Sequence, residues 1–278
     1  MVTTLVGVLG LVLALLATLA FARARHDRRI AGIARRLLRP AAPGGFDPAT
    51  LGELPAPARR FFLHTLAPGA PLARSATLEM EGGIALRPGT AKLPFRARQV
   101  ISADGLVWQA WVGRGLMRFS GDDAFADGAG AMRWFLWGLV PIVRAGGPHV
   151  TSSAAGRVGL EVPGMLPAAL LPRPGVHWDV VDDRTARVVF RVGDEDVSPA
   201  ITVGEDGRLE RIEMMRWDEQ GPNGAPGYVA WAVELSGDRT FGAVTVPTVV
   251  RVTKRAGTPE ADAFFEARFT RVTFTAVS

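Results

Sequence analysis

The chain opens with a long apolar run, residues 2–22, that contains no charged side chain. At about 1.5 Å of rise per residue, a helix of this length spans roughly 30 Å, the thickness of the hydrocarbon core of a bilayer. The run therefore predicts a transmembrane helix, and with it a single-pass protein of the cell membrane.

Residues 23–39 continue the helical pattern, with Ile30, Ile33, Leu37 and Leu38 as an apolar stripe among arginines. Such a helix either lies along the lipid headgroups or packs as a stalk on its own domain, and the pattern leaves both open. The side chains predicted to face the membrane surface are Arg23, Arg25, Arg28, Arg29, Arg35, Arg36 and Arg39.

Proline and glycine then interrupt the helix. Five prolines and the pair Gly44-Gly45 fall between residues 40 and 57, which is typical of a linker. A short helix is expected to begin at Pro57. Proline suits the first turn of a helix, because the N–H that it lacks would have no partner within the helix there. The predicted parts are a transmembrane anchor (1–22), a basic juxtamembrane helix with a Pro/Gly linker (23–53) and an α+β domain (54–278).

From Ser75 onward the polarity alternates with a period of two, which indicates strands. Asp104-Gly105 separates two such runs and is a strong hairpin signal. About ten strands at close spacing predict a large antiparallel sheet or a partly closed barrel with covering helices. After the hairpin, strands are expected near residues 178–181, 186–192, 197–203, 208–217, 229–235, 244–252 and 266–274.

Two segments depart from the alternation and predict helices. Residues 131–143 are dense in apolar side chains but too short to span a membrane. Residues 152–171 are interrupted at Pro163-Gly164 and at Pro167. Both helices are expected to cover one face or one mouth of the sheet.

The net charge of +5 belongs to the segment after the apolar run. Seven arginines against Asp27 give residues 23–39 a charge of +6, and removing it leaves −1 for the rest. That balance does not favour nucleic-acid binding, whereas membrane lipid is a natural partner of the arginines. A topology signal that binds no specific lipid is the simpler interpretation of the same residues. The sequence has no cysteine, which excludes disulfides and thiolate metal sites. No metal or cofactor is predicted.

The side of the membrane follows from the flanking charges, which by the positive-inside rule place the domain in the cytoplasm. Ala20-Phe21-Ala22 has the small-x-small form of a signal-peptidase site. A cleaved signal, however, has a basic start and a shorter apolar core. The residues therefore favour an uncleaved anchor.

Carboxylates are the best candidates for chemistry. They fall around two predicted loops, and if these loops met they could bind Ca²⁺ or share a proton. Local hydrogen bonding in turns is the simpler role. The two groups are Asp122, Asp123 and Asp127, and Asp179, Asp182 and Asp183.

Motifs for nucleophilic or zinc chemistry are weak. Ser120-Gly121-Asp122 and Ser236-Gly237-Asp238 are interpreted as strand-end turns, not as nucleophile elbows. No catalytic residue is assigned. A hydrolase or metal-dependent enzyme stays an alternative that requires four side chains to converge at one mouth of the sheet: Asp122, Asp127, Glu161 and His149.

Aromatic residues are more suggestive. Five of them fall within thirty residues, where both faces of a strand are apolar. Such a segment can pack a core on one side and line a cavity for apolar ligands on the other. The residues predicted to line a ligand site are Trp108, Trp111, Trp134, Phe135 and Trp137.

Several short motifs follow one another along most of the chain from about residue 50. They include Leu54-Pro55-Ala56-Pro57, Met80-Glu81-Gly82, Pro94-Phe95-Arg96-Ala97-Arg98-Gln99, Asp127-Gly128-Ala129-Gly130, Leu166-Pro167 and Trp178. Their order resembles an uncharacterised family of membrane-anchored bacterial proteins, a domain of unknown function. The sheet pattern is similar to the lipoprotein-carrier fold, a curved antiparallel half-barrel around helices whose concave face holds acyl chains. That likeness implies an extracytoplasmic domain, against the charge rule.

The leading hypothesis is a non-enzymatic, membrane-anchored protein that binds an apolar or acyl ligand between sheet and helices. The alternatives are the hydrolase described above and an assembly protein whose aromatic segment docks a partner. The identity of the ligand and the oligomeric state are left open.

Overall fold

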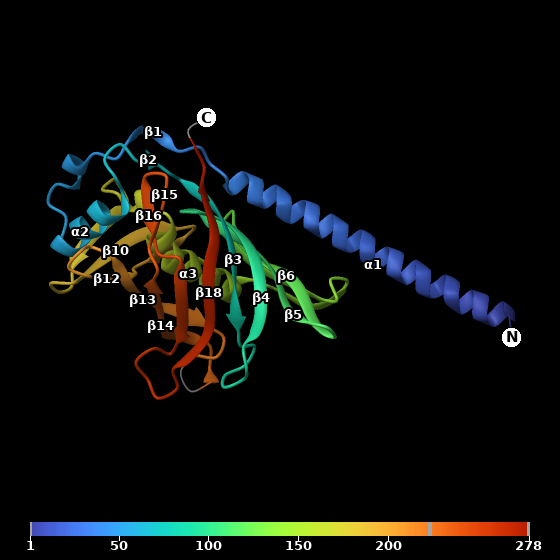
Figure 1. Cartoon of the computed structure of the whole chain (residues 1–278). Helices are drawn as coiled ribbons and strands as arrows, with labels where there is room; N and C mark the ends of the chain where they lie inside the picture. Colours follow the sequence, from blue (N-terminus) through green and yellow to red (C-terminus); the bar gives the residue numbers. More distant parts are fainter. Residues whose placement is uncertain (1, 222–223, 277–278) are drawn as a thin grey trace.

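The structure is a computed structural model that describes residues 2–221 and 224–276. Within these residues the chain forms three α-helices, two 3₁₀ turns and eighteen strands (Figure 1). The helical elements are α1 (Val2–Leu37), η1 (Pro48–Leu51), α2 (Ala56–Thr65), α3 (Pro148–Met165) and η2 (Pro167–Leu170).

Fourteen strands form one antiparallel sheet, in which β9 (Val176–Val180) pairs with β10 beside the main order. Across the sheet the order is β11 (Glu195–Val197), β10 (Thr185–Val192), β12 (Ala200–Val203), β13 (Leu209–Asp218), β14 (Gly227–Ser236), β17 (Val249–Lys254), β18 (Asp262–Phe274), β3 (Ser75–Ile84), β4 (Leu93–Ser102), β5 (Gly105–Arg114), β6 (Met117–Ala126), β7 (Ala129–Leu136) and β8 (Val140–Gly146).

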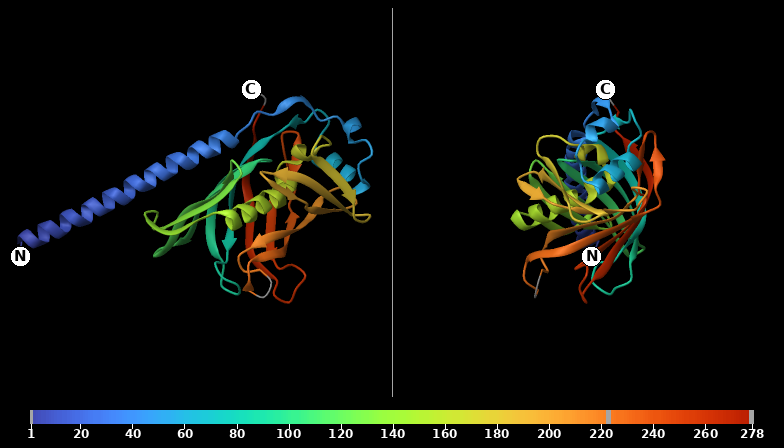
Figure 2. Two further views of the ribbon diagram at one scale, coloured as in Figure 1. Left: turned by 180° about the vertical axis from the view of Figure 1, so that it is seen from behind. Right: turned by 90° about the vertical axis from the view of Figure 1, so that its left-hand side faces the viewer.

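Two small sheets complete the strands. They are β1 (Ala42–Gly45) with β2 (Pro71–Leu72), and β15 (Arg239–Phe241) with β16 (Val244–Val246). The sheet is open, curved and antiparallel, with a few helices and a long apolar N-terminal helix (Figure 2). The predicted fold class is therefore confirmed.

The two faces of the sheet carry different partners. In β4, β5 and β6 the cross-strand line Gln99–Trp108–Asp123 lies on the inner face. The neighbouring line Val100–Val107–Ala124 lies on the outer face, because successive side chains in a strand point to opposite sides. The inner face packs on α3, and the outer face packs on α1.

Helix α3 crosses the inner face and contacts both β7 and β13 (Figure 2). Two glycines allow the close approach. A Cβ on Gly156 would lie 2.8 Å from Cγ of Arg216, and one on Gly159 would lie 2.9 Å from Cβ of Val197. The helix runs through Pro163 and ends at Met165, so the predicted interruption at Pro163-Gly164 is wrong. A proline in the last turn removes only one hydrogen bond.

Helix α1 projects far beyond the sheet, and only its second half touches the domain (Figure 1). Ile30 and Leu37 are buried against Val100, Val107 and Ala124. The juxtamembrane helix thus packs as a stalk on its own domain. The 18-residue apolar window of α1 is fully exposed and is long and apolar enough to cross a membrane.

The predicted helix over residues 131–143 is wrong, because this segment forms the hairpin β7–β8. Trp137 and Gly138 make its turn with φ of 52° and 74°. A segment that is apolar at nearly every position fits a buried helix and a strand equally well. Here pairing with β6 selects the strand, since Phe119 to Ala126 are the register partners of β7.

The predicted turn at Ser120-Gly121-Asp122 is also wrong, because these residues lie in the middle of β6. Asp122 and Asp123 are therefore strand residues, whereas Asp127 lies in the β6–β7 turn. All three residues of the tripeptide pair through the backbone with β5 and β7. Glycine and aspartate favour turns only as an average over local preferences, and pairing on both sides overrides that preference.

Gly121→Ala should destabilise the domain, because the added Cβ would lie 2.6 Å from Cδ2 of Trp134 and against the carbonyl of Arg133. We expect a loss of about 2 kcal/mol, or roughly 4–8 °C in the midpoint of thermal unfolding of the detergent-solubilised full chain. Gly146→Ala is the matched control, since its nearest neighbour is 3.6 Å away. Equal midpoints for the two variants would contradict the packing described.

Candidate functional site

A cavity of about 210 Å³ lies between α3 and the inner face of the sheet. Its floor consists of aliphatic and aromatic side chains from β3, β13, β14, β17 and β18, and its roof is the second half of α3. The strands curve away from the straight helix, and small residues such as Gly164 line the roof. The space is therefore apolar over most of its wall and polar at a few positions.

A closed polar network forms one wall. Arg157 of α3 donates from Nε to Glu161 Oε1 (2.7 Å), from Nη1 to Asp123 Oδ2 (3.2 Å) and from Nη2 to Gln99 Oε1 (3.3 Å). Gln99 Nε2 donates to the other oxygen of Glu161, and Trp134 Nε1 donates to Asp123 Oδ1 (3.0 Å). Every charged group in this network has at least two partners.

The network is also electrostatically coupled. Burial raises the pKa of Asp123 above its ordinary value, although Arg157 and Trp134 counteract it. Ionising Asp123 thus opposes folding, and Arg157 limits that cost. Burial alone would lower the pKa of Arg157, but Glu161 and Asp123 raise it. This arrangement stabilises Arg157 as a cation.

Arg216 of β13 faces the same cavity, but among the described residues its guanidinium group has fewer hydrogen-bond and ion-pair partners than that of Arg157. Its Nε donates to the Ser153 carbonyl (2.9 Å) and its Nη2 to Ser153 Oγ (3.3 Å). Within the described part of the chain it makes no ion pair with a carboxylate and no hydrogen bond through Nη1. Its guanidinium stacks over Trp231 at 4.1 Å. Burial, followed by repulsion from Arg157, lowers the pKa of Arg216 to about 10.

The cavity adjoins a more polar hollow of about 280 Å³, with which it shares Lys254 and Phe264. Lys254 pairs with Asp218 (3.1 Å) and lies 4.9 Å from the Trp231 ring. The polar end of the cavity is thus its junction with a second hollow.

Two indoles of the wall have donors without acceptors. Nε1 of Trp108 and Nε1 of Trp231 are buried and make no hydrogen bond with the described residues. A buried donor without a partner costs about 1–3 kcal/mol. The wall therefore carries more hydrogen-bond donors than the protein itself uses.

The five predicted aromatic residues fall into two groups. Trp108 lines the cavity, and the Trp134 ring lies behind it, tilted by 55° with the two ring centroids 5.8 Å apart. The other three lie elsewhere: Phe135 is buried beneath α1, Trp111 is 53% exposed on the outer face, and Trp137 is 51% exposed in the β7–β8 turn. The structure brings two of the five together at the cavity.

The four residues of the hydrolase alternative do not converge. Asp122 bonds to His26 (2.6 Å) on the outer face, and Asp127 pairs with Arg36. Glu161 lines the cavity, and His149 stacks on Trp217 at 5.0 Å. Each has a separate partner and a separate place in the fold.

The two predicted carboxylate loops do not form a common site either. Asp179 lies in β9, and Asp182 caps the β9–β10 turn by accepting from the backbone N–H of Arg184 and of Thr185. Its pKa is lowered by these hydrogen bonds. Among residues 2–221 and 224–276, no group of three His, Asp or Glu side chains is arranged to hold a metal ion.

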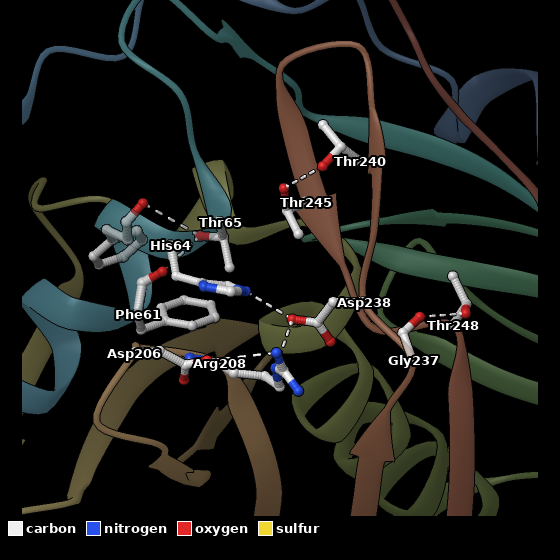
Figure 3. Close-up of polar contacts among 11 residues, drawn as sticks. Phe61, His64, Thr65, Asp206, Arg208, Gly237, Asp238, Thr240, Thr245 and Thr248 are labelled. Carbon is white, nitrogen blue, oxygen red and sulfur yellow. Dashed lines mark hydrogen bonds and ion pairs between the residues drawn. The ribbon is translucent and has the colours of Figure 1, made fainter.

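A second polar cluster lies where α2 meets the turn after β14 (Figure 3). His64 bonds through Nε2 to Asp238 Oδ2 (2.7 Å), and Arg208 approaches the same oxygen at 3.7 Å. The hydroxyls drawn nearby bond to backbone carbonyls or to each other, as Thr65 bonds to Phe61 O (2.9 Å). The cluster ties α2 to the sheet.

The seven arginines predicted to face the membrane surface fall into two groups, those that pair with a carboxylate of the described residues and those that do not. Arg23, Arg36 and Arg39 pair with carboxylates of α1 or of the domain. The other four are exposed: Arg25, Arg28, Arg29 and Arg35.

Sequence reasoning missed Arg157 and Arg216. A signal was present for Arg216, because it continues the inward positions of β13 after Ile212 and Met214. A charged residue at an inward position of an alternating strand marks a polar site inside the fold. The neighbours of Arg157 in the sequence, Gly156 and Val158, show no polarity pattern that would have marked it as facing the cavity.

A family model described as a family of unknown function (DUF6544) matches residues 44–267. Among solved structures, a crystal structure of a LolA superfamily protein from Nitrosomonas europaea is similar with 10% identity and a TM-score of 0.38. That similarity covers 74% of this chain and 87% of the other. No curated protein matches the chain.

Arg157→Met should destabilise the fold, because it leaves Asp123 and Glu161 without their shared cation. We expect about 2–4 kcal/mol, measured as the midpoint of thermal unfolding. Arg211→Met is the control, since Arg211 pairs with Glu213 and Glu234 on the solvent side of β13, where such pairs contribute at most about 1 kcal/mol. A similar loss of stability in both variants would show that the network of Arg157 contributes no more than a surface ion pair.

Proposed function

The chain belongs to this family of unknown function, and we propose that it is a membrane-tethered protein that binds an apolar or lipid-like ligand under α3. The observation that carries the proposal is the cavity itself. A mostly apolar space with a few convergent polar groups, held by a sheet and a helix, is the usual form of a small-molecule site. Trp108 and Trp134 are the aromatic residues that we assign to it.

The tether is the first half of α1. Its apolar window is exposed along its whole length, and exposed apolar surface of that size is stable only in lipid or against a partner. The exposed arginines Arg25, Arg28 and Arg29 follow within two turns and suit the headgroup layer. The tether would thus hold the cavity close to the lipid bilayer, in which an apolar ligand dissolves.

Two hairpin ends support the same location. Leu116 and Met117 at the β5–β6 end, and Trp137 and Ile142 at the β7–β8 end, are about half exposed or more. Arg23 Nη1 lies 3.4 Å from Ser120 Oγ, next to this region. Exposed apolar and aromatic side chains at the level where an apolar helix ends favour contact with the membrane interface.

If α1 is a transmembrane anchor, the full chain should stay in the membrane pellet after an alkaline carbonate wash. Replacing Leu11 and Leu15 by arginine should release it, since each charge at a helix centre costs about 2.5–3.5 kcal/mol on insertion. The intact mass of the recovered protein distinguishes an uncleaved anchor from a signal removed after Ala22. Extraction of the unaltered chain would contradict the tether.

A photoreactive alkyl probe tests the cavity. With the full chain in phosphatidylcholine nanodiscs, we expect a diazirine-bearing heptanol to label peptides of α3, β14 and β17 as well as α1. Val252→Trp should lower the cavity labelling about tenfold relative to α1, because its side chain lines the cavity and a larger ring fills the space.

The matched control is Arg251→Trp, whose side chain is exposed on the other face of the same strand. It should leave the labelling ratio unchanged. Labelling confined to α1 in the unaltered chain would overturn the proposed function, and melting curves separate a filled cavity from an unfolded domain.

A further inference from the structure

The charges around the cavity are balanced in number but not in position. Arg157 is shared by the two carboxylates Asp123 of β6 and Glu161 of α3, a local charge of −1. Arg216 of β13 and Lys254 of β17 accompany one carboxylate, Asp218, a local charge of +1. The part of the wall formed by β13 and β17 is therefore where an anion would be stabilised.

Arg216 supplies that part of the wall with an available cation. Lys254 is engaged with Asp218, whereas the bonds of Arg216 to the part of the chain that the structure describes go to the two oxygens of Ser153. With a pKa of about 10, Arg216 is charged at neutral pH. Nη1 makes no hydrogen bond within the described residues, and neither does Nε1 of Trp231, the ring on which Arg216 stacks. Hydrogen-bond donors thus outnumber acceptors here.

The backbone holds Arg216 in this place. Its stem crosses α3 at Gly156, where a Cβ would lie 2.8 Å from Cγ of Arg216. The Ser153 carbonyl one turn earlier accepts from Nε (2.9 Å). A guanidinium fixed on one edge presents its other edge in a defined direction, which suits the two oxygens of a carboxylate.

From this polar end an apolar wall extends along the strands. Val233 and Leu235 follow Trp231 at alternate positions of β14, with Val250 and Phe269 beside them. The volume of about 210 Å³ equals roughly seven groups of the size of a water molecule. One alkyl chain of about seven carbons fills such a space, and two chains exceed it.

We propose that the ligand is a single-chain amphiphile with one carboxylate, bound by Arg216 beside Trp231, with its alkyl chain along Val233, Leu235 and Phe269. This inference rests on the proposed function, because it requires that the cavity binds an apolar chain. It adds the headgroup, its charge and the number of chains.

The test compares four photoreactive seven-carbon probes that differ only in their headgroup: carboxylate, alcohol, amine and phosphate. Each is added to the full chain in phosphatidylcholine nanodiscs, and labelling of the cavity peptides is divided by labelling of α1, which corrects for partition into the bilayer. We expect the carboxylate ratio to exceed the alcohol ratio about tenfold, the size of one charge-assisted hydrogen-bonded contact.

Arg216→Met should reduce the carboxylate ratio to the alcohol ratio and leave the alcohol ratio unchanged. Arg216→Lys retains the charge without the planar donor pair and should restore only part of the preference. Arg211→Met, on the outer face of the same strand, should change neither ratio. Melting curves verify that each variant is folded, and the alcohol ratio serves as an internal check of the cavity.

Each other outcome is decisive. Equal labelling by carboxylate and alcohol would overturn the headgroup assignment but leave the proposed function intact. Stronger labelling by the amine would reverse the inferred charge, and stronger labelling by the phosphate would replace the carboxylate by a phosphate monoester. No cavity labelling by any probe would overturn the proposed function itself.

Discussion

The alternation of side chains in β4, β5 and β6 is the constraint on which the rest of the structure depends. Adjacent residues of one strand serve opposite sides of the sheet. Asp122 bonds to His26 of α1 on the outer face, and Asp123 bonds to Arg157 of α3 on the inner face. A shift of register by one residue would exchange the two sets and leave both helices without their contacts.

The cavity exists because α3 fits the curved sheet closely at some places and not at others. At Gly156 and Gly159 the helix approaches the strands as near as backbone and short stems permit. Farther along, between Leu160 and Met165, a cavity remains between the helix and the strands. The closed network of Arg157 then fixes the distance between helix and sheet, so the space persists instead of collapsing.

The alternating pattern predicted the antiparallel sheet, because strands such as β4 and β13 have one face in the core and one in water. The hairpin β7–β8 escaped prediction, because Trp134, Phe135 and their neighbours are apolar on both faces and the period is lost. The cavity could be predicted only in part. The density of aromatic residues pointed to the segment that contains Trp108, which lines the cavity, whereas Arg157 and Arg216 reach the cavity from elements about sixty residues apart, which no local pattern records.

The continuity of α1 has a consequence for how the protein works in a bilayer. The helix is unbroken from Val2 to Leu37, and its last turns are fixed to the outer face through Ile30 and Leu37. The connection between the apolar half of α1 and the domain is therefore a rigid helix and not a flexible linker. With the proposed anchoring in lipid, helix and domain tilt and turn as one body, and the cavity keeps a fixed position relative to the axis of α1.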